Sequence, residues 1–413
     1  MSKNCQPKTI TQFLKSLGPG LLFAGASIGV SHLVMSTKAG AEYGFGLIWA
    51  LLLVHLFKYP FFQYGPRYAM ATGESLVDGY RKLGKGILIT YFILAFCTMF
   101  TIQAAVTIVT AGLAINLFGL TENPVTWSII ITIIIVLLLL IGRYKLLDNL
   151  MKVIIVVLTV TTITSVVAAT LGNETSYSFT QILPKGSLEI GFLIAFLGWM
   201  PSPLDLSVIH SLWALEKKKE TPDFNTKKSI TDFNIGYIFT IILGLCFLSL
   251  GVLIMYDTGE NFSASAGGFA QQLIGLYTSV IGDWMYLIIA IAAFTTMFST
   301  TLTTLDASPR ALSATVSILS KNTIKKSYWF WIFLLSIGTI IILAYFISEM
   351  GTLIKIATIL SFLSAPFFAI SNFVLISGKH TPKEWHPSLS MKILSYLGII
   401  FLIGFSGWYL MNL

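Results

Sequence analysis

Long apolar stretches alternate with short polar ones along the whole chain. Each apolar stretch runs for about 20 residues, which is the length a helix needs to cross roughly 30 Å of hydrocarbon. The stretches are continuous, whereas a membrane barrel strand alternates apolar and polar residues. The pattern therefore predicts an all-α integral membrane protein. We expect eleven transmembrane helices, at about residues 17–44, 46–71, 86–117, 125–142, 148–171, 189–214, 229–256, 275–315, 328–348, 350–377 and 390–412.

Composition agrees with this interpretation and excludes other classes of protein. Of the 413 residues, 55% are hydrophobic and 11% charged, against about 25% charged in a soluble domain. The chain has no HExxH motif and no Gly-rich phosphate loop, so we expect no enzyme activity. We also expect no resident cofactor.

The basic residues gather in alternate loops. Most of the Lys and Arg residues lie in the segments at residues 3–15, 81–85, 143–152, 217–228, 310–326 and 379–383. The loops that alternate with these segments hold almost none, Lys185 being the exception. The positive-inside rule explains the net charge of +8, so nucleic acid is not an expected partner. We expect a multi-pass protein of a prokaryotic inner (plasma) membrane, with the N-terminus in the cytoplasm and the C-terminus outside. Its partners would be the lipid bilayer and a small transported solute.

Two of the predicted helices are interrupted. The middle of the first, Gly25 to His32, is small and polar where Leu and Ile should dominate. The sixth holds Pro201 and Pro203, which cannot both fit a regular helix. Opened backbone at membrane depth is tolerated only where it lines a cavity or packs inside protein.

The positions of these breaks indicate an internal repeat. Interrupted helices at corresponding places in two halves are typical of inverted-repeat transporters with a midplane site. We therefore expect one transmembrane transporter domain over residues 1–413. It would contain a first five-helix repeat at 17–171, a second at 189–377 and an additional helix at 390–412.

Three segments resemble the NRAMP divalent-metal transporters. These are GPGLLFAGASIGVSHLVMSTKAGAEYG with the stretch after it, the sequence ATGESL at Ala71 to Leu76, and WMPSPLDLS at Trp199 to Ser207. The helix 8 stretch FSTTLTTLDA is similar as well. The resemblance implies a LeuT-like fold with 5+5 inverted repeats, broken helices 1 and 6, and ion-coupled alternating access.

The chain departs from that family at the metal site. The family's Asp-Pro-Gly-Asn motif falls on residues 29–32, so Gly29 stands for the metal-binding aspartate and His32 for the asparagine. The helix 6 methionine is kept as Met200. Mn²⁺ and Mg²⁺ prefer carboxylate, carbonyl and water ligands. If a metal binds at all, Met200 and His32 are its candidate ligands, and two neutral ligands make a weak cage.

The altered lining suits hydrogen bonding to a small anion or a small polar solute, and bicarbonate is the concrete candidate. The alternative is import of a divalent metal such as Mn²⁺ or Mg²⁺. Half-helix N-termini at the breaks favour anions. The expected substrate-binding residues lie at the two breaks and are Ser27, Gly29, Val30, Ser31, His32, Met200, Pro201, Ser202, Pro203 and Asp205, with Ser207 nearby.

The driving ion is open between Na⁺ and H⁺. A Na⁺ site in a LeuT-like fold would use helix 1 carbonyls and helix 8 hydroxyls, here Ser299, Thr300 and Thr303. A proton would use His32 or Asp205.

Lys58 lies near the middle of the second predicted helix, where a lysine is costly. It either pairs with Asp205 or Asp306 or adds positive potential to the cavity. We expect ordinary i,i+4 pairs for Asp306 with Arg310 and for Lys38 with Glu42.

Overall fold

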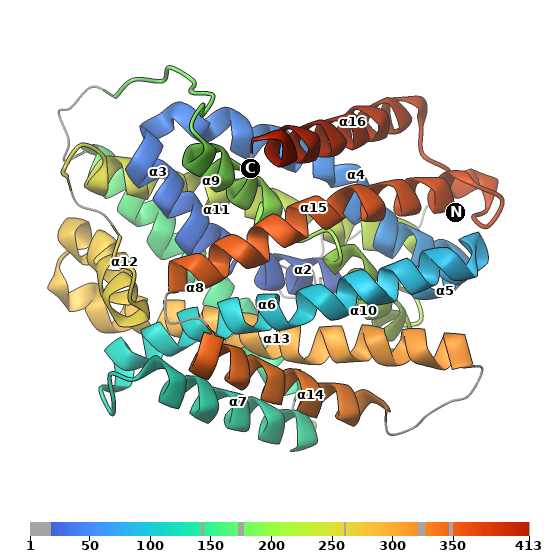
Figure 1. Cartoon of the computed structure of the whole chain (residues 1–413), viewed down its shortest axis with the longest axis horizontal. Helices are drawn as coiled ribbons and strands as arrows, with labels where there is room; N and C mark the ends of the chain where they lie inside the picture. Colours follow the sequence, from blue (N-terminus) through green and yellow to red (C-terminus); the bar gives the residue numbers. More distant parts are fainter. Residues whose placement is uncertain are drawn as a thin grey trace, which may run out of the picture.

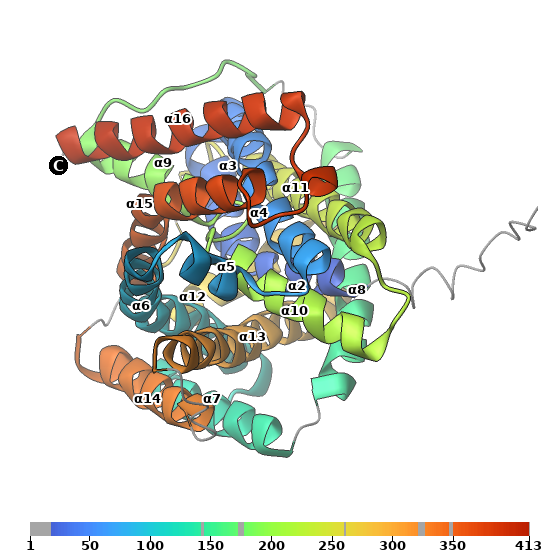
Figure 2. The same ribbon diagram turned by 90° about the vertical axis from the view of Figure 1, so that its right-hand side faces the viewer.

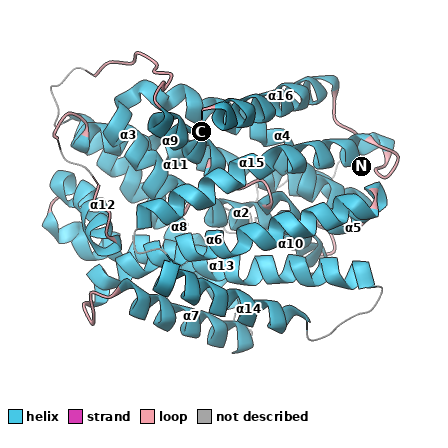
Figure 3. Ribbon diagram, viewed as in Figure 1, coloured by secondary structure: helices cyan, strands magenta, loops and turns pink. Residues whose placement is uncertain are grey.

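The computed structural model describes residues 18–141, 144–171, 177–259, 262–320, 327–346 and 350–412. These residues form helices joined by loops, with no strand among them (Figure 3). The remaining residues, including residues 1–17 of the expected domain and the ends of some predicted helices, lie outside the described part.

The first half of the chain follows the predicted spans closely. Its helices form from long apolar runs, and two of them end at Gly73 and Gly119, which adopt the left-handed conformation. The elements are α2 (Pro19–Ser27), η1 (Ser31–Ser36), α3 (Thr37–Tyr43), η2 (Gly44–Leu47), α4 (Ile48–Thr72), α5 (Leu76–Leu83), α6 (Lys85–Phe118), α7 (Pro124–Ile141) and α8 (Tyr144–Leu171).

The second half begins with another interrupted helix. The elements are α9 (Ser187–Trp199), α10 (Leu206–Glu220), α11 (Thr226–Met255), α12 (Ala266–Ile281), η3 (Asp283–Met285), α13 (Tyr286–Ser320), α14 (Ser327–Ile341), η4 (Ile342–Phe346), α15 (Met350–Ser377), η5 (Lys383–Trp385) and α16 (Leu389–Met411).

Within the described residues, eight helices are long and apolar enough to cross a membrane. The interrupted sixth helix gives only a shorter apolar piece, Ser187–Trp199. The count of eleven spans therefore stays a prediction. The orientation in the membrane also stays a prediction. In Figure 1, α5 and the α15–α16 connection, which are both rich in basic residues, lie together at the end of the bundle opposite α12.

Two boundaries were predicted wrongly. The expected eighth helix at 275–315 is two helices, α12 and α13, because Gly282 adopts a φ of +114° between them. The short helix α5 was not foreseen. It begins with a capping box in which the Ser75 side chain accepts from the Asp78 amide and Asp78 accepts from the Ser75 amide.

Glycines let both parts of the interrupted first helix lie directly on α11. A Cβ on Gly20 would meet the Asp232 carbonyl oxygen at 2.1 Å, and one on Gly236 would meet that of Gly20 at 2.0 Å. On the other side of the interruption, a Cβ on Gly40 would meet the Leu248 oxygen at 2.0 Å, and one on Gly251 the Thr37 oxygen at 2.1 Å. The backbones are therefore in contact without side chains between them.

The interrupted helices lie in the interior of the bundle. Figures 1 and 2 both place α2 among other helices, while α7 and α14 lie side by side at one edge. α11, α13 and α10 pack against α2, and α4 packs against both halves of the interrupted sixth helix, α9 and α10. This arrangement brings opened backbone into the protein interior, as the sequence predicted for backbone at membrane depth.

Candidate functional site

The first interruption spans three residues. α2 ends at Ser27, and the chain leaves the helical conformation at Ile28, with φ −79° and ψ +72°. The next element, η1, begins at Ser31. The Ser31 hydroxyl lies 2.6 Å from the Ser27 carbonyl oxygen, which takes up one of the acceptors freed by the break. The break therefore falls inside the predicted segment Gly25 to His32.

The second interruption lies between α9 and α10. Met200 is extended, with φ −83° and ψ +124°, and Leu206 is the first residue of α10. Pro201 has no N–H, so the Leu197 carbonyl loses its helical donor. The Ser31 hydroxyl lies 3.3 Å from the Pro201 carbonyl oxygen, so the two interruptions touch.

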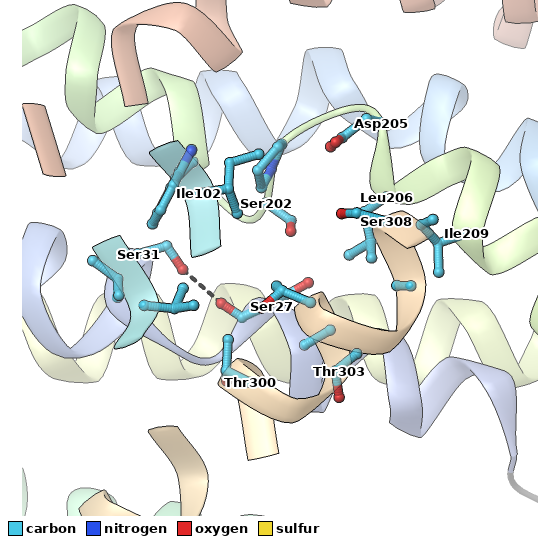
Figure 4. A pocket seen from close by; sticks show the side chains of 17 residues that line it. Ser27, Ser31, Ile102, Ser202, Asp205, Leu206, Ile209, Thr300, Thr303 and Ser308 are labelled. Carbon is cyan, nitrogen blue, oxygen red and sulfur yellow. Dashed lines mark hydrogen bonds between the residues drawn. The ribbon is translucent and has the colours of Figure 1, made fainter. Parts of the chain in front are cut away.

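A cavity of about 60 Å³ lies where the two interruptions meet α6 and α13 (Figure 4). One water molecule needs roughly 10–15 Å³ of cavity volume, so this cavity suits a solute of a few heavy atoms. Its apolar wall includes Ile102, Val106 and Ile209, and Asp205 is its one acidic lining residue among the described residues. The hydroxyl-bearing residues that line it are Ser27, Ser31, Ser202, Thr300, Thr303, Thr304 and Ser308.

The structure brings most of the predicted site residues to this cavity. Their roles in binding stay predictions. Those that line it are Ser27, Val30, Ser31, Ser202, Pro203, Asp205, Thr300 and Thr303. Those that do not line it are Gly29, His32, Lys58, Met200, Pro201, Ser207 and Ser299.

Gly29 packs against α13. A Cβ at this position would lie 3.0 Å from both the hydroxyl oxygen and the methyl carbon of Thr300. The Thr300 hydroxyl lies 3.1 Å from the Thr296 carbonyl oxygen and 3.4 Å from that of Gly25. A hydroxyl on α13 is therefore adjacent to a carbonyl oxygen on α2, which is the proximity that the predicted Na⁺ site requires.

His32 and Met200 are turned into the protein. The His32 Nδ1 lies 2.7 Å from the Ser31 hydroxyl oxygen and 3.0 Å from the Ser27 carbonyl oxygen, and its Nε2 lies 2.9 Å from the Thr240 carbonyl oxygen. The Met200 sulfur is fully buried, and the Ser36 hydroxyl donates to it at 4.0 Å. Metal binding would break these contacts. Within the described residues, no three His, Cys, Asp or Glu side chains are grouped to hold a metal ion.

The predicted pairing of Lys58 with Asp306 is wrong. Asp306 instead accepts three hydrogen bonds from Arg310, the shortest at 2.7 Å, and one from the Tyr328 hydroxyl. Lys58 also forms no ion pair with Asp205 in the described part of the chain, because its ammonium donates to backbone carbonyls. The predicted pairs Asp306–Arg310 and Lys38–Glu42 are confirmed, the latter at 3.4 Å.

Asp232 of α11 is a site-supporting residue that sequence reasoning missed. Its carboxylate accepts from the Gly18 amide at 3.0 Å and from the Gly20 amide at 2.7 Å, at the N-terminus of α2. A carboxylate suits the positive end of a helix dipole. The sequence did contain a sign of this role, because Asp232 is an acidic residue at the edge of an apolar run and close to Gly236.

The chain matches one family model almost throughout. The model, described as Natural resistance-associated macrophage protein-like (Nramp), covers residues 20–412. This chain belongs to the Nramp family. The resemblance identified from the sequence is confirmed. The Nramp protein is accordingly a multi-pass membrane transporter and not an enzyme.

Relatives of this Nramp protein include one with substantial identity. An uncharacterized protein of Pasteurella multocida (strain Pm70) is 35% identical over 404 residues, which cover 95% of this chain and 93% of the relative. The divalent metal cation transporter MntH of Staphylococcus aureus (strain MRSA252) is 24% identical over 413 residues, with 95% and 89% covered.

Solved structures agree on the fold. A manganese transporter of Eremococcus coleocola matches with a TM-score of 0.67 at 15% identity, over 97% of this chain and 87% of that one. MHP1, a nucleobase-cation-symport-1 family transporter, matches with a TM-score of 0.59 at 14% identity, over 95% and 92%. The Nramp protein therefore has the LeuT-like fold that the sequence predicted.

Proposed function

We propose that this Nramp protein moves a small polar solute by alternating access, and that the solute is a small anion such as bicarbonate. The observation that carries the proposal is the cavity lining. Seven hydroxyl-bearing residues and one carboxylate, that of Asp205, line a space of about 60 Å³. Hydroxyls donate hydrogen bonds to anions and to neutral polar groups alike.

The surrounding charges support an anion. The Lys58 ammonium bonds to the carbonyl oxygen of Ser202, a cavity residue, at 3.3 Å. Helix α10 begins at Leu206, which also lines the cavity, so the partial positive charge at the N-terminus of this helix lies beside the same space. Both features offset the charge of Asp205.

Import of a divalent metal is the second candidate. It is favoured by the relatives named as metal transporters, such as MntH of Staphylococcus aureus. Against it stands the chemistry of the described site. The position that the resemblance gives to the metal-binding aspartate is Gly29, and His32 and Met200 are held by protein partners.

For the driving ion, two arrangements are proposed. Na⁺ would bind between the carbonyls at the end of α2 and the hydroxyls of Thr300 and Thr303, with Ser299 close by on α13. H⁺ would be carried by Asp205, which lines the cavity, or by His32. A Na⁺ dependence that survives Asp205→Asn would favour the first arrangement.

Two further proposals concern the chain as a whole. The first is a single transporter domain over residues 1–413, with repeats at 17–171 and 189–377. The second is an inner-membrane topology with the N-terminus in the cytoplasm. A reporter that is active only outside the cytoplasm, fused after residue 413, would be active under this topology and silent under the reverse one.

The test of function is flux into liposomes that contain the purified protein. Uptake of labelled bicarbonate and of formate would be compared with uptake of Mn²⁺ and Mg²⁺, with and without Na⁺ and pH gradients. The proposal expects saturable anion uptake above that of protein-free liposomes. Clear Mn²⁺ uptake that is lost in Met200→Ala would overturn it in favour of the second candidate.

A further inference from the structure

Lys58 is enclosed at the second interruption. It lies on α4, its side chain is 0% exposed, and its ammonium donates to three backbone carbonyls. The acceptor oxygens are those of Leu197 at 2.7 Å, Gly198 at 2.7 Å and Ser202 at 3.3 Å. All three N–H donors of the ammonium are therefore used by the backbone of one short segment.

These carbonyls are available because of the local sequence. In a continuous helix the Leu197 carbonyl would accept from residue 201, which is Pro201 and has no N–H. The extended conformation at Met200 removes the donor for Gly198. The Leu206 amide bonds to the Pro203 oxygen at 3.1 Å and so does not return to Ser202. The three oxygens converge on one point inside the protein.

Convergent carbonyl oxygens are the chemistry of a monovalent cation site. Rings of backbone carbonyls replace the hydration shell of alkali ions in selectivity filters. The C-terminal end of a helix adds roughly half a negative charge. A cage of neutral oxygens with no carboxylate suits an ion of single charge, such as Na⁺, K⁺ or ammonium.

We propose that the Lys58 ammonium is a tethered cation, which permanently fills a monovalent cation site formed by the carbonyls at the end of α9. The interruption of the sixth helix then needs no dissolved cation at this point to satisfy its backbone. The proposal concerns the helix break alone and does not depend on which solute is transported.

The location of Lys58 gives the tether a mechanical role. α9 is fixed to α15, because a Cβ on Gly198 would meet the Thr358 oxygen at 2.1 Å and the Trp199 indole N–H donates to the Ser361 hydroxyl at 2.8 Å. α10 is fixed to α4, because a Cβ on Gly65 would meet the Ser207 oxygen at 2.2 Å. The Lys58 side chain therefore links two closely packed helix pairs across the break.

The experiment replaces the tethered cation with a dissolved one. Full-length wild type and Lys58→Ala would be purified in detergent, and the Tm followed by tryptophan fluorescence. Chloride salts of Na⁺, K⁺, ammonium and choline would be compared at constant ionic strength. Choline is too large for the cage. We expect a wild-type Tm that does not distinguish these salts. In choline, Lys58→Ala should melt below wild type, and at least one small cation should raise its Tm with a saturable concentration dependence.

Two further variants sharpen the result. Lys58→Arg keeps a tethered cation and should remain insensitive to the choice of salt. Lys355→Ala removes a lysine that lines a different cavity and should also show no ion-specific rise. A Tm of Lys58→Ala that is the same in choline and in every small cation would overturn the proposal. A rise of the wild-type Tm in small cations that equals the rise in Lys58→Ala would also overturn it. Failure of Lys58→Ala to fold in all four salts would count against it as well, because a filled cage should support folding.

Discussion

The hydroxyl oxygen of Ser31 lies 3.3 Å from the carbonyl oxygen of Pro201, so a side chain of the first interruption contacts the backbone of the second. The same hydroxyl lies 2.6 Å from the Ser27 carbonyl oxygen. Its one proton can serve only one of these two carbonyl oxygens at a time, and the shorter contact is the stronger one. Ser31 therefore joins the two halves of the candidate site, and it also lines the cavity.

Removal of this hydroxyl should weaken transport. A buried hydrogen bond contributes about 1 kcal/mol, which corresponds to roughly a fivefold change in an equilibrium constant. We expect Ser31→Ala to raise the KM for the transported solute by about that factor. Ser31→Thr, which keeps the hydroxyl, should stay close to wild type. Equal KM values for wild type and Ser31→Ala in liposome flux would remove Ser31 from the binding site.

A carboxylate at position 29 should shift the cargo toward metal. Gly29→Asp would place a negative charge beside the cavity, next to Thr300, whose side chain must move slightly because a Cβ would lie 3.0 Å from it. We expect Mn²⁺ binding to appear or strengthen in calorimetry, together with loss of anion flux. Gly29→Asn has nearly the same size without the charge and should bind no metal. Mn²⁺ binding by wild type as tight as that of Gly29→Asp would contradict the anion proposal.

The Na⁺ proposal depends on the Thr300 hydroxyl. Thr300→Val keeps the shape of the side chain and loses the oxygen that lies 3.4 Å from the Gly25 carbonyl oxygen. We expect Na⁺-stimulated uptake to fall to the level seen without Na⁺, while Thr300→Ser retains the stimulation. Uptake of Thr300→Val that still responds fully to Na⁺ would place the coupling site elsewhere.

Close backbone contact predicts a large stability effect at Gly198. A Cβ there would lie 2.1 Å from the Thr358 carbonyl oxygen, far inside van der Waals contact. We expect Gly198→Ala to lower the Tm of the detergent-solubilised protein, with a cost of about 1–3 kcal/mol or more for the forced backbone shift. Gly275→Ala is the matched control, because a Cβ at Gly275 would meet nothing within 4 Å. Similar Tm values for the two variants would mean that α9 and α15 separate easily.

The sequence was a good guide where one local rule decides the structure. Membrane helices follow from apolar length, and the second interruption follows from Pro201 and Pro203, since proline cannot donate to a helix. The turn at Gly282 was one of the two features of the helix boundaries that the sequence prediction missed. The positive φ of this glycine turns the chain between two apolar helices, and only the short pair Gly282-Asp283 marks that turn in the sequence.

Side-chain directions after the first interruption could not be counted from the sequence. η1 is a π-helix from Ser31 to Ser36, and a π turn contains more residues than an α turn. Spacings counted as α-helical are therefore out of register there. His32 directly follows the cavity residue Ser31, and its ring lies against Thr240 of α11 and does not line the cavity.

The contacts of Lys58 were beyond sequence reasoning for a different reason. Its acceptors are carbonyl groups about 140 residues away in the chain, and every residue type carries a carbonyl. A search for acidic partners therefore pointed to the wrong residues. For Asp232 the acidic side chain is visible in the sequence but its partners are not, because its carboxylate accepts from the backbone amides of two glycines.

The glycine contacts along α11 have a consequence for movement. α2 and α3 each lie on this one helix, through Gly20 and Gly236 on one side of the interruption and Gly40 and Gly251 on the other. Sliding either half along α11 would push a Cα hydrogen or a neighbouring side chain against a carbonyl oxygen. The gap at residues 28–30 thus exposes backbone polar groups without releasing the two halves from each other. We expect α2, α3 and α11 to travel as one rigid body when the transporter changes the side to which it is open.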